Sequence, residues 1–575
     1  MCGIIGYVGI REAYPILLQG LERLEYRGYD SAGIATSAEN SILVKKTVGR
    51  VGNLKEQYSS GRCGIAHTRW ATHGKPSDQN AHPFTDAKNQ LVVVHNGIIE
   101  NHLELKEELR KKGVQFSSET DSEVIVHLLA ESYSGDLREA VLKTVLRLQG
   151  TFAFLVLKHD GEEMVGARNG SPLVVGLGKG ENFLASDVSA LIEHTKKVVY
   201  LHDYEIVQVD KDTISIFDFQ GKPVQREVKV IDWDIEQAQK QGYKHFMLKE
   251  ILEQPTVIKN SLPGRLVLPQ PLSRICIVAC GTASHAGLVG KYIIEEVAKI
   301  QVMNETASEF RYKEPLLSSE DIVIAISQSG ETADTLAAVR LAKEKKLRTL
   351  GIINVMDSTI AREVDAVMYT QAGPEIGVAS TKAFTAQLIM LYKLAFQLAG
   401  KEMDNSFVRK ILQAVDLREN IRAVAEKYQH YNHFLYIGRN RNFPLALEGA
   451  LKLKEISYIH AEAYPAGELK HGPIALVSED MPTVALCPQD EVYEKMLSNI
   501  QEIKARNGKV IAIATAGDEK IKTIADEVIY VPKVEALYYP ILLAIPLQLF
   551  AYYIADKREC DIDKPRNLAK SVTVE

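Results

Sequence analysis

The chain has 575 residues, enough for about three or four compact domains, and its 46% hydrophobic and 25% charged residues are typical of soluble globular proteins. Lys and Arg number 68 against 74 Asp and Glu, which gives a formal net charge of -6. This mild acidity lacks the basic footprint that phosphate-backbone binding requires, so we expect no nucleic acid partner. The composition also excludes disordered and collagen-like chains.

Six cysteines lie along the chain without the spacing of a disulfide framework, so we expect a reducing, cytoplasmic setting. The N-terminus has no basic region followed by an apolar stretch and a cleavage site, which argues against a signal peptide. Residues 536–555 are uncharged over the length of a membrane span, but Pro540, Pro546 and Gln548 favour a buried or interface helix. We therefore expect no membrane partner.

The first part of the chain, to about Val230, consists of short β-type runs separated by Gly, Asn and Asp turns. Two amphipathic patterns, over 11–24 and 121–132, predict helices. A glycine-rich run at 176–180 joins two β-type runs and opens no helix, so it predicts a hairpin rather than a dinucleotide loop. We expect a strand-dominated sandwich with strands over 4–8, 91–95, 152–157, 198–201 and 205–209.

Residues 231–253 are polar and rich in Gln, as expected of a joint between domains. Beyond them, apolar β-branched strands alternate with helical segments, which predicts parallel sheets covered by helices on both faces. The pattern occurs twice with nearly equal spacing, so we expect two tandem doubly wound lobes. The predicted strands are 275–279, 322–326, 349–353, 434–437, 483–486 and 510–514.

The chain begins Met-Cys-Gly, so Cys2 becomes the first residue once the initiator methionine is removed. An N-terminal cysteine carries its own α-amino group, with an ordinary pKa of about 7.7 to 8.0, which can act as general base for the thiol. Two further stretches, 67–74 and 94–97, place polar groups at the ends of apolar strands. His95 and His102 lack the helix spacing of a metal hydrolase, so we expect no metal site.

These stretches, with 23–33 and 119–123, resemble the N-terminal-nucleophile glutamine amidotransferases. The resemblance implies that Cys2 attacks the side-chain amide of glutamine. It implies an oxyanion site made by Asn96 and the backbone N–H of Gly97, in which one donor is typically worth about 100- to 1000-fold in rate. It also implies that Arg69 binds the α-carboxylate of glutamine, that Asp121 binds the α-ammonium and that Trp70 is a gate toward an ammonia passage. The implied glutamine-binding residues are Arg69, Trp70, Thr72, His73 and Asp121.

In the first predicted lobe, the strand over 322–326 runs into Ser327-Gln328-Ser329-Gly330-Glu331-Thr332 and then into a helix. Hydroxyl and backbone N–H groups at a helix N-terminus form an anion site. The Gly-Lys-Ser/Thr ending of a nucleotide-triphosphate loop is absent, so a sugar monophosphate fits better. Similar loops follow at 280–284 and 378–382; each alone could be ordinary helix capping, but three together favour a phosphate pocket.

In the second lobe, residues 446–455 predict a helix that places Glu448, Lys452 and Glu455 on one face. A solvated stripe of ion pairs is the simplest interpretation of such spacing. Further ionisable groups follow at once amid apolar residues, including His471, which favours a site.

These motifs and the ending 563–575 closely resemble the glutamine–fructose-6-phosphate aminotransferase family, over nearly the whole chain. The resemblance implies an α/β fold: an N-terminal-nucleophile αββα sandwich glutaminase domain followed by two doubly wound sugar isomerase (SIS) lobes. The implied domains are an amidotransferase domain over 2–238, a linker over 239–250 and an isomerase domain over 251–575, with lobes at about 266–405 and 425–563 and a tail over 564–575. The implied sugar-phosphate-binding residues are Thr282, Ser327, Gln328, Ser329, Thr332, Val378, Ser380 and Ala569.

The resemblance also implies catalytic roles in the isomerase half. His471, reaching across a homodimer interface, assists ring opening of the sugar, and Lys570 forms a Schiff base with its C2 carbonyl. Glu455 moves a proton between C1 and C2, with Lys452 and Glu448 as supporting groups. No redox or metal cofactor is implied.

Two other functions remain open on sequence alone. One is a regulatory protein whose lobes only sense a sugar phosphate, but binding alone needs neither a proton shuttle nor a Schiff-base amine. The other is an enzyme acting on another ketose phosphate or in the deaminating direction, against which the glutaminase half argues.

Overall fold

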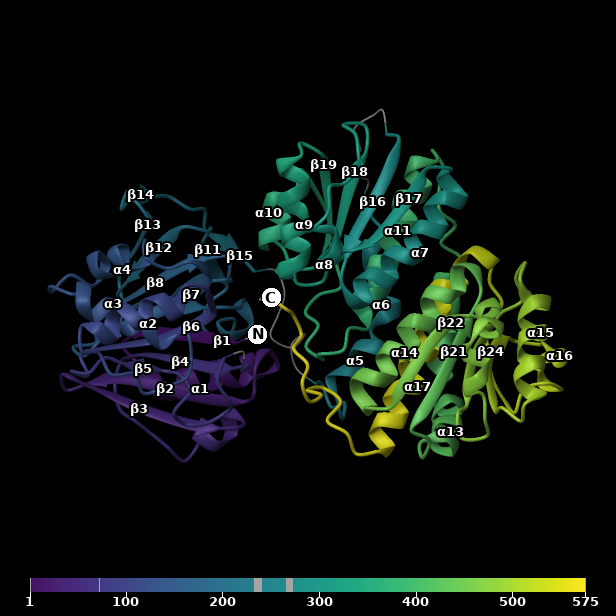
Figure 1. Cartoon of the computed structure of the whole chain (residues 1–575), viewed down its shortest axis with the longest axis horizontal. Helices are drawn as coiled ribbons and strands as arrows, with labels where there is room; N and C mark the ends of the chain where they lie inside the picture. The colour runs from purple at the N-terminus through teal and green to yellow at the C-terminus, as the bar shows by residue number, and fades with distance from the viewer. Residues whose placement is uncertain (1, 72, 232–239, 265–271, 574–575) are drawn as a thin grey trace. The chain divides into compact units, whose positions relative to one another are not determined.

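The computed structural model describes residues 2–71, 73–231, 240–264 and 272–573. The chain divides into two compact units (Figure 1). The first comprises Met1–Ala238 together with the C-terminal residues Ala569–Glu575, and the second comprises Gln239–Leu568.

The described part of the first unit is built on two antiparallel sheets. One has the strand order β15-β11-β9-β10-β1-β4-β2-β3 and the other β14-β13-β12-β8-β7-β6-β5. The strands of the first sheet are β1 (Gly3–Gly9), β2 (Ser31–Ala38), β3 (Ser41–Val48), β4 (Cys63–Arg69), β9 (Val174–Leu177), β10 (Glu181–Ala185), β11 (Lys197–Tyr200) and β15 (Lys229–Val230). Those of the second sheet are β5 (Phe84–Thr85), β6 (Leu91–Ile99), β7 (Gly150–Lys158), β8 (Met164–Asn169), β12 (Glu205–Val209), β13 (Ile214–Asp218) and β14 (Pro223–Val224).

The two sheets pack face to face with helices on their outer faces. Alternate residues of β1 point to opposite sides: Ile5 packs in the cluster with helix α1, whereas Ile4 packs against β6 and β7 of the other sheet. Helices α3 and α4 cover β6 and β7 from the far side. This arrangement confirms the predicted αββα sandwich, with helices α1 (Ala13–Leu24), α2 (His102–Lys111), α3 (Glu123–Ser132) and α4 (Leu137–Val145).

The two helices expected in this unit are present as α1 and α3, but the prediction of only two was wrong. Helix α2 buries only Leu105, Lys106 and Leu109, so its sequence shows little apolar periodicity. Helix α4 is short and begins at the capping carboxylate of Asp136, which accepts from the Glu139 N–H. The predicted hairpin is confirmed, because β9 pairs directly with β10.

The described second unit contains two parallel five-stranded sheets with the same order, β17-β16-β18-β19-β20 and β22-β21-β23-β24-β25. The equal order confirms the two doubly wound lobes. The strands are β16 (Arg274–Ala279), β17 (Gln301–Thr306), β18 (Ile322–Ser327), β19 (Arg348–Ile353), β20 (Ala366–Tyr369), β21 (His433–Gly438), β22 (His460–Pro465), β23 (Thr483–Cys487), β24 (Val510–Thr515) and β25 (Glu527–Val531).

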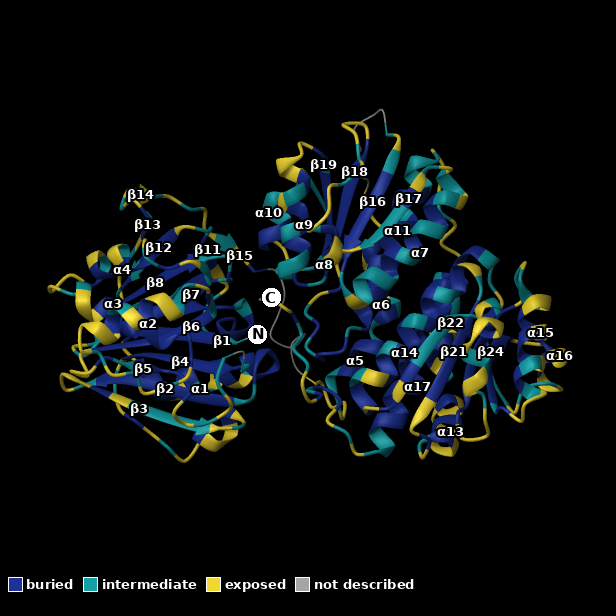
Figure 2. Cartoon of the chain, viewed as in Figure 1, coloured by how far each residue is buried: buried dark blue, intermediate teal, exposed yellow. Residues whose placement is uncertain are grey.

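Helices cover both faces of these sheets. Strands β16 and β18 of the first sheet are buried, whereas helices α15 and α16 on the outside of the second lobe have exposed positions (Figure 2). They are α5 (Phe246–Leu252), α6 (Gln254–Ser261), α7 (Gly281–Ala298), α8 (Ala307–Phe310), α9 (Ala333–Glu344), α10 (Thr359–Glu363), α11 (Lys382–Leu398), α12 (Val408–Asp416), α13 (Arg418–Tyr428), α14 (Phe443–Ser457), α15 (Tyr493–Lys504), α16 (Glu519–Lys522) and α17 (Tyr539–Lys557). Helix α5 begins inside the segment predicted as a linker, where Asp563 accepts from the Phe246 and Met247 N–H groups at 2.9 and 3.0 Å.

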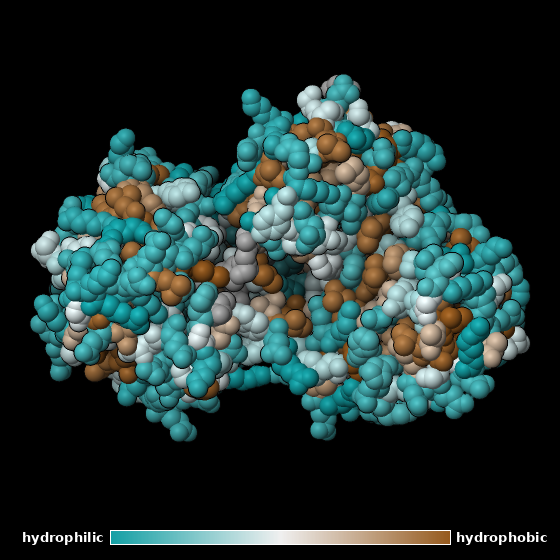
Figure 3. Space-filling view, in the orientation of Figure 1, coloured by the Kyte–Doolittle hydropathy of each residue, from teal (hydrophilic) through white to brown (hydrophobic). Residues whose placement is uncertain are grey.

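Helix α17 belongs to a core shared by both lobes. Among the described residues, Ala536–Lys557 is the segment long and apolar enough to span a membrane, and its apolar window is completely buried in the protein. The expectation of a buried helix over 536–555 is therefore confirmed. The visible faces of both units are mainly hydrophilic (Figure 3).

Candidate active site

Cys2 directly precedes β1, next to the end of β4. The backbone N–H of Trp70 donates to Cys2 Sγ at 3.2 Å. Burial raises the pKa of the Cys2 thiol, although the Trp70 hydrogen bond and the charge of Arg69 act in the opposite direction. The thiol is thus protonated at neutral pH, so it needs a general base to become a nucleophile.

Asn96 lies on β6 in the other sheet and reaches the nucleophile. Its Nδ2 donates to the Cys2 carbonyl at 3.0 Å. Gly97 follows with a φ of 125°, and a Cβ there would lie 2.0 Å from the carbonyl oxygen of Thr151. Only glycine fits this position, so the backbone at the predicted oxyanion site is fixed by β7.

Arg69 ends β4 with its side chain buried. Its Nη2 donates to the carbonyls of His73 and Gly74, the latter at 3.1 Å, while its Nη1 is buried without a hydrogen-bond partner among the described residues. An unpaired guanidinium N–H is suited to a substrate carboxylate. Asp30 holds the loop that follows by accepting from the Ala71 N–H at 2.8 Å.

The predicted residues of that loop are only partly described. The Trp70 ring packs edge-on against Tyr29, with centroids 6.0 Å apart, and the His73 ring packs against His102. Thr72 lies outside the described residues.

Asp121 is buried just before α3, and its Oδ2 accepts from the Ile99 N–H at 2.8 Å. The turn that carries it is held by Glu123, whose carboxylate accepts from the Ser117 and Ser118 N–H groups, both at 2.7 Å. Burial alone would raise the pKa of Glu123, but hydrogen bonds from His127, Ser117 and Ser118 lower it to about 2.

This shift predicts a pH-dependent stability. A carboxyl whose pKa is lower in the folded state than its ordinary value near 4.3 stabilises the fold above that value, by about 3 kcal/mol here, and about 2 kcal/mol of this is lost by pH 3. We expect the free energy of unfolding of wild type to fall more steeply between pH 5 and pH 3 than that of Glu123→Gln.

Urea unfolding followed by tryptophan fluorescence measures this, because Trp70 belongs to the first unit. Parallel pH profiles of the two proteins would contradict the prediction.

In the second unit, the first lobe has its topological switch point between β16 and β18. In doubly wound sheets, ligands bind at the carboxyl ends of the strands that flank this point. Thr282, at the start of α7, follows β16, and Ser327 ends β18. Both predicted sugar-phosphate residues therefore lie at the edge of the sheet where a ligand is expected.

The loop from Ser327 to Thr332 folds on its own hydroxyl groups. Ser327 Oγ lies 3.0 Å from Thr332 Oγ1 and accepts from the Gly330 N–H at 2.9 Å, and the carbonyl of Gln328 accepts from Asn354 and Val355 at 3.3 Å. Ser329 Oγ accepts from the Glu331 N–H at 3.2 Å. Gly330 has a φ of 66°, and a Cβ there would lie 1.9 Å from Ser358 Oγ.

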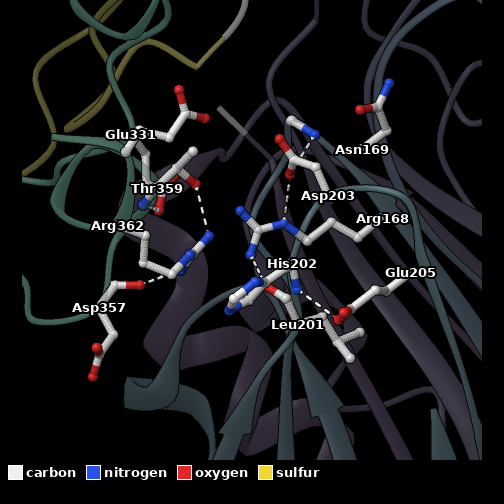
Figure 4. A network of polar contacts seen from close by, with 12 residues as sticks. Arg168, Asn169, Leu201, His202, Asp203, Glu205, Glu331, Asp357, Thr359 and Arg362 are labelled. Carbon is white, nitrogen blue, oxygen red and sulfur yellow. Dashed lines mark hydrogen bonds and ion pairs between the residues drawn. The ribbon is translucent and has the colours of Figure 1, made fainter. Parts of the chain in front are cut away.

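Glu331 ties this loop to α10. Its carboxylate accepts from the Thr359 N–H at 2.8 Å, and Arg362 of the same helix bonds back to the Asp357 carbonyl and to Thr359 Oγ1 (Figure 4). The loop that leads into α9 is thus fixed at Glu331 to the start of α10.

The third predicted loop is ordered by Glu375. Ser380 Oγ donates to its carboxylate at 3.0 Å, and the N–H groups of Thr381 and Ala383 donate at 2.9 and 3.0 Å. The Val378 N–H donates to the Asp563 carbonyl at 3.1 Å. The first N–H groups of α11 are therefore capped by Glu375 and not by the Ser380 hydroxyl, which donates to the same carboxylate.

The predicted charged face of α14 is buried rather than solvated. Lys452 has no exposed surface, and its Nζ lies 3.3 Å from Glu448 Oε1, 2.5 Å from Glu455 Oε2 and 3.0 Å from Thr282 Oγ1. Burial alone would lower the pKa of Lys452, but the two carboxylates outweigh it and hold the pKa above its ordinary value. The ammonium group is therefore charged and fixes the position of Glu455.

Residues 271–396 and 427–555 match the model of the SIS domain, and residues 67–193 match that of a glutamine amidotransferase domain. The chain is 54% identical to the glutamine–fructose-6-phosphate aminotransferase (isomerizing) of Aquifex aeolicus and 52% identical to that of Thermus thermophilus, each over the full length of both chains. It belongs to the glutamine–fructose-6-phosphate aminotransferase family.

Two solved structures resemble the second unit. The C-terminal domain of glucosamine-fructose-6-phosphate aminotransferase from Francisella tularensis is 40% identical, with a TM-score of 0.53, and the match covers 56% of this chain and 99% of that one. A glucosamine-6-phosphate deaminase from Thermotoga maritima is 27% identical, with a TM-score of 0.51, covering 57% and 100%.

The structure adds one residue, missed by the sequence analysis, to the cluster of Lys452, Glu448, Glu455 and Thr282. His285 on α7 lies with its Nδ1 2.8 Å from Glu448 Oε2, and Thr282 Oγ1 donates to Glu448 Oε1 at 3.1 Å. His285 follows Thr282 by three residues, so the helix spacing placed both on one face. The cluster thus spans α7 and α14, the helices that follow the corresponding first strands of the two lobes.

The second lobe has no equivalent of the hydroxyl loop after β23. There, Asp490 Oδ2 accepts from Asn442 at 2.7 Å and Glu491 pairs with Arg441 at 2.5 Å. Carboxylates and their partners occupy this switch point, so it does not suit a phosphate.

Three predicted residues are not brought to the α14 cluster by a described contact. His471 is exposed at the end of the 3₁₀ turn Ala466–His471. Ala569 and Lys570 are half-buried and belong to the first compact unit. Their roles remain predictions.

Proposed function

We propose that the chain converts D-fructose 6-phosphate and L-glutamine into D-glucosamine 6-phosphate and L-glutamate, the entry step of amino-sugar synthesis. The observation that carries the proposal is the buried Lys452 between Glu448 and Glu455, in a chain that also holds Cys2 beside an unpaired Arg69 N–H. A sugar-sensing protein needs neither feature.

In the glutaminase half, Arg69 and Asp121 bind the α-carboxylate and α-ammonium of glutamine. The α-amino group of Cys2, freed by removal of Met1, takes the thiol proton as the sulfur attacks the side-chain amide. Asn96 Nδ2 and the Gly97 N–H stabilise the oxyanion. Ammonia leaves, and water hydrolyses the thioester to glutamate.

In the isomerase half, the Ser327–Thr332 loop binds the phosphate of the open-chain ketose. Lys570 condenses with the C2 carbonyl, releasing water, and ammonia then displaces the lysine to leave a C2 imine. Glu455 takes a proton from C1 and returns it to C2, giving the aldose amine. Lys452 holds the Glu455 carboxylate in position, and His471 assists ring opening.

The proposed domains are the amidotransferase domain over 2–238, the linker over 239–250 and the isomerase domain over 251–575. We also propose a homodimer, because His471 is exposed on its own subunit and acts across the interface in the proposed mechanism. A cytoplasmic location fits the six cysteines, which lack the spacing of a disulfide framework.

The decisive experiment is mass spectrometry of products after mixing the purified protein with glutamine and fructose 6-phosphate, beside controls that lack each substrate. Glucosamine 6-phosphate with equal glutamate supports the proposal. Glutamate without amino sugar contradicts the isomerase half, and neither product contradicts both halves.

The phosphate loop makes its own prediction. In Gly330→Ala, the added Cβ would collide with Ser358 Oγ and take a strained φ, so the loop must move. We expect kcat/KM for fructose 6-phosphate to fall about 10- to 100-fold while glutaminase activity is unchanged.

Gly373→Ala is the matched control, because Gly373 has the same φ of 66° but nothing lies within 4 Å of its added Cβ. Equal losses in the two variants would mean that the conformation of Gly330 does not serve the phosphate.

A further inference from the structure

Three buried histidines lie close to one another in the first unit, beginning next to Asn96. We call them the histidine row: His67 on β4, His82 before β5 and His95 on β6, each at most 3% exposed. The His67 and His82 rings stack with centroids 4.0 Å apart, and the His82 and His95 centroids are 6.5 Å apart. None of the three has a role in the mechanism above.

His67 contacts the oxyanion residue directly. Its Nε2 lies 2.9 Å from the His95 carbonyl oxygen and 3.1 Å from Asn96 Oδ1. A carbonyl oxygen can only accept, so Nε2 carries the proton. His67 Nδ1, which is then a bare lone pair, is buried without a hydrogen-bond partner among the described residues.

This proton decides which way the Asn96 amide faces. With Oδ1 toward His67, Nδ2 points to Cys2 and donates to its carbonyl at 3.0 Å. The opposite orientation would set an N–H against an N–H at His67 and an oxygen against an oxygen at Cys2. Two such mismatched buried groups cost far more than the bonds they replace.

The histidines stay neutral across the physiological range. Burial, together with the charge of Arg69, lowers the pKa of His67 to about 3, and burial lowers that of His95 to about 4. His95 Nδ1 lies 2.8 Å from Ser122 Oγ, which donates to Asp121 Oδ1 at 3.4 Å. The facing groups therefore hold the rings of His67 and His95 each in one tautomer.

The position of His67 explains why such a contact is needed. Cys2 precedes β1 of the first sheet, whereas Asn96 belongs to β6 of the second. His67 is paired with Ile4 in the strand next to β1, so it connects Asn96 to the sheet that carries the nucleophile. A shift between the sheets would otherwise change the distance between nucleophile and oxyanion donor.

We propose that His67 is a positioning residue of the glutaminase reaction, whose Nε2–H fixes the Asn96 amide with its N–H groups toward Cys2 and the developing oxyanion. The proposal rests on the proposed function, because it assigns Asn96 to that oxyanion.

A double-mutant cycle on the full-length protein tests it through glutamate release. Asn96→Ala alone should lower kcat about 100- to 1000-fold. His67→Leu alone should lower kcat about 10- to 100-fold, with the KM for glutamine within about twofold of wild type. On the Asn96→Ala background, His67→Leu should cost less than about threefold, because its effect passes through the missing amide.

His67→Gln is the conservative variant, because its amide N–H can replace the imidazole donor, and it should recover most of the lost rate. Equal costs of His67→Leu in both backgrounds, or a raised KM with unchanged kcat, would overturn the proposal. Tryptophan fluorescence checks that each variant is folded.

A second measurement does not depend on activity. Nitrogen NMR of ¹⁵N-histidine protein, with His67→Gln to assign the signal, should show the Nε2–H tautomer of His67 from pH 5 to pH 9. The Nδ1–H tautomer or a charged ring would overturn the proposal. If wild type releases no glutamate, the proposed function fails, and the tautomer still decides whether His67 orients Asn96.

Discussion

Replacing Cys2 with alanine should abolish glutamine-dependent synthesis of glucosamine 6-phosphate. Without the sulfur, no thioester forms, and the Trp70 N–H, Asn96 and Arg69 surround a site with no nucleophile. We expect glutamate release to fall at least about 1000-fold, as for other single deletions of a nucleophile. The measurement is glutamate release with fructose 6-phosphate present and absent.

Cys560→Ala is the matched control, because Cys560 is also a half-buried free thiol, but lies in the second unit. It should retain full activity. Glutamate release by Cys2→Ala at the wild-type rate would refute the assignment of the nucleophile.

The second large effect is expected from Glu455→Gln. The amide keeps the shape of the side chain but cannot take a proton from C1, so amino-sugar formation should fall about 100- to 10,000-fold. Lys452 keeps its contacts with Glu448 and Thr282, so the change in folding stability should be small. Glutamate release without sugar should be unchanged.

The exposed Glu468 supplies the control, Glu468→Gln, which should leave both activities intact. Loss of glutamate release in Glu455→Gln would indicate general misfolding. Retained synthesis would remove Glu455 from the proton transfer.

Much of this architecture could be predicted because buried parallel strands appear in the sequence as uninterrupted runs of apolar, β-branched residues. The β-branched runs at 275–279 and 322–326 have no polar interruption, and each is observed as a parallel strand. Helix α2 escaped prediction because Leu105 and Leu109 are almost its only buried apolar side chains, and neither period nor propensity stands out.

The site divides in the same way. The position of Cys2 behind the initiator methionine was enough to propose it as a nucleophile from sequence. His67 and His285 contact partners far away in sequence, Asn96 and Glu448, and a sequence pattern alone does not show such long-range contacts. Burial of the Lys452 face likewise depends on α7 packing against α14, which no local spacing encodes.

The unlike switch points of the two lobes have a consequence for how a substrate is admitted. A phosphorylated ketose is a rod with one dianionic end and one reactive end. In the proposed mechanism, hydroxyl groups at Ser327 receive the anionic end in one lobe, whereas Asp490 and Glu491, paired with Asn442 and Arg441, occupy the equivalent place in the other. Under that mechanism, two nearly symmetric lobes offer a single place for the phosphate, so the C1–C2 end of the sugar points toward α14 and Glu455.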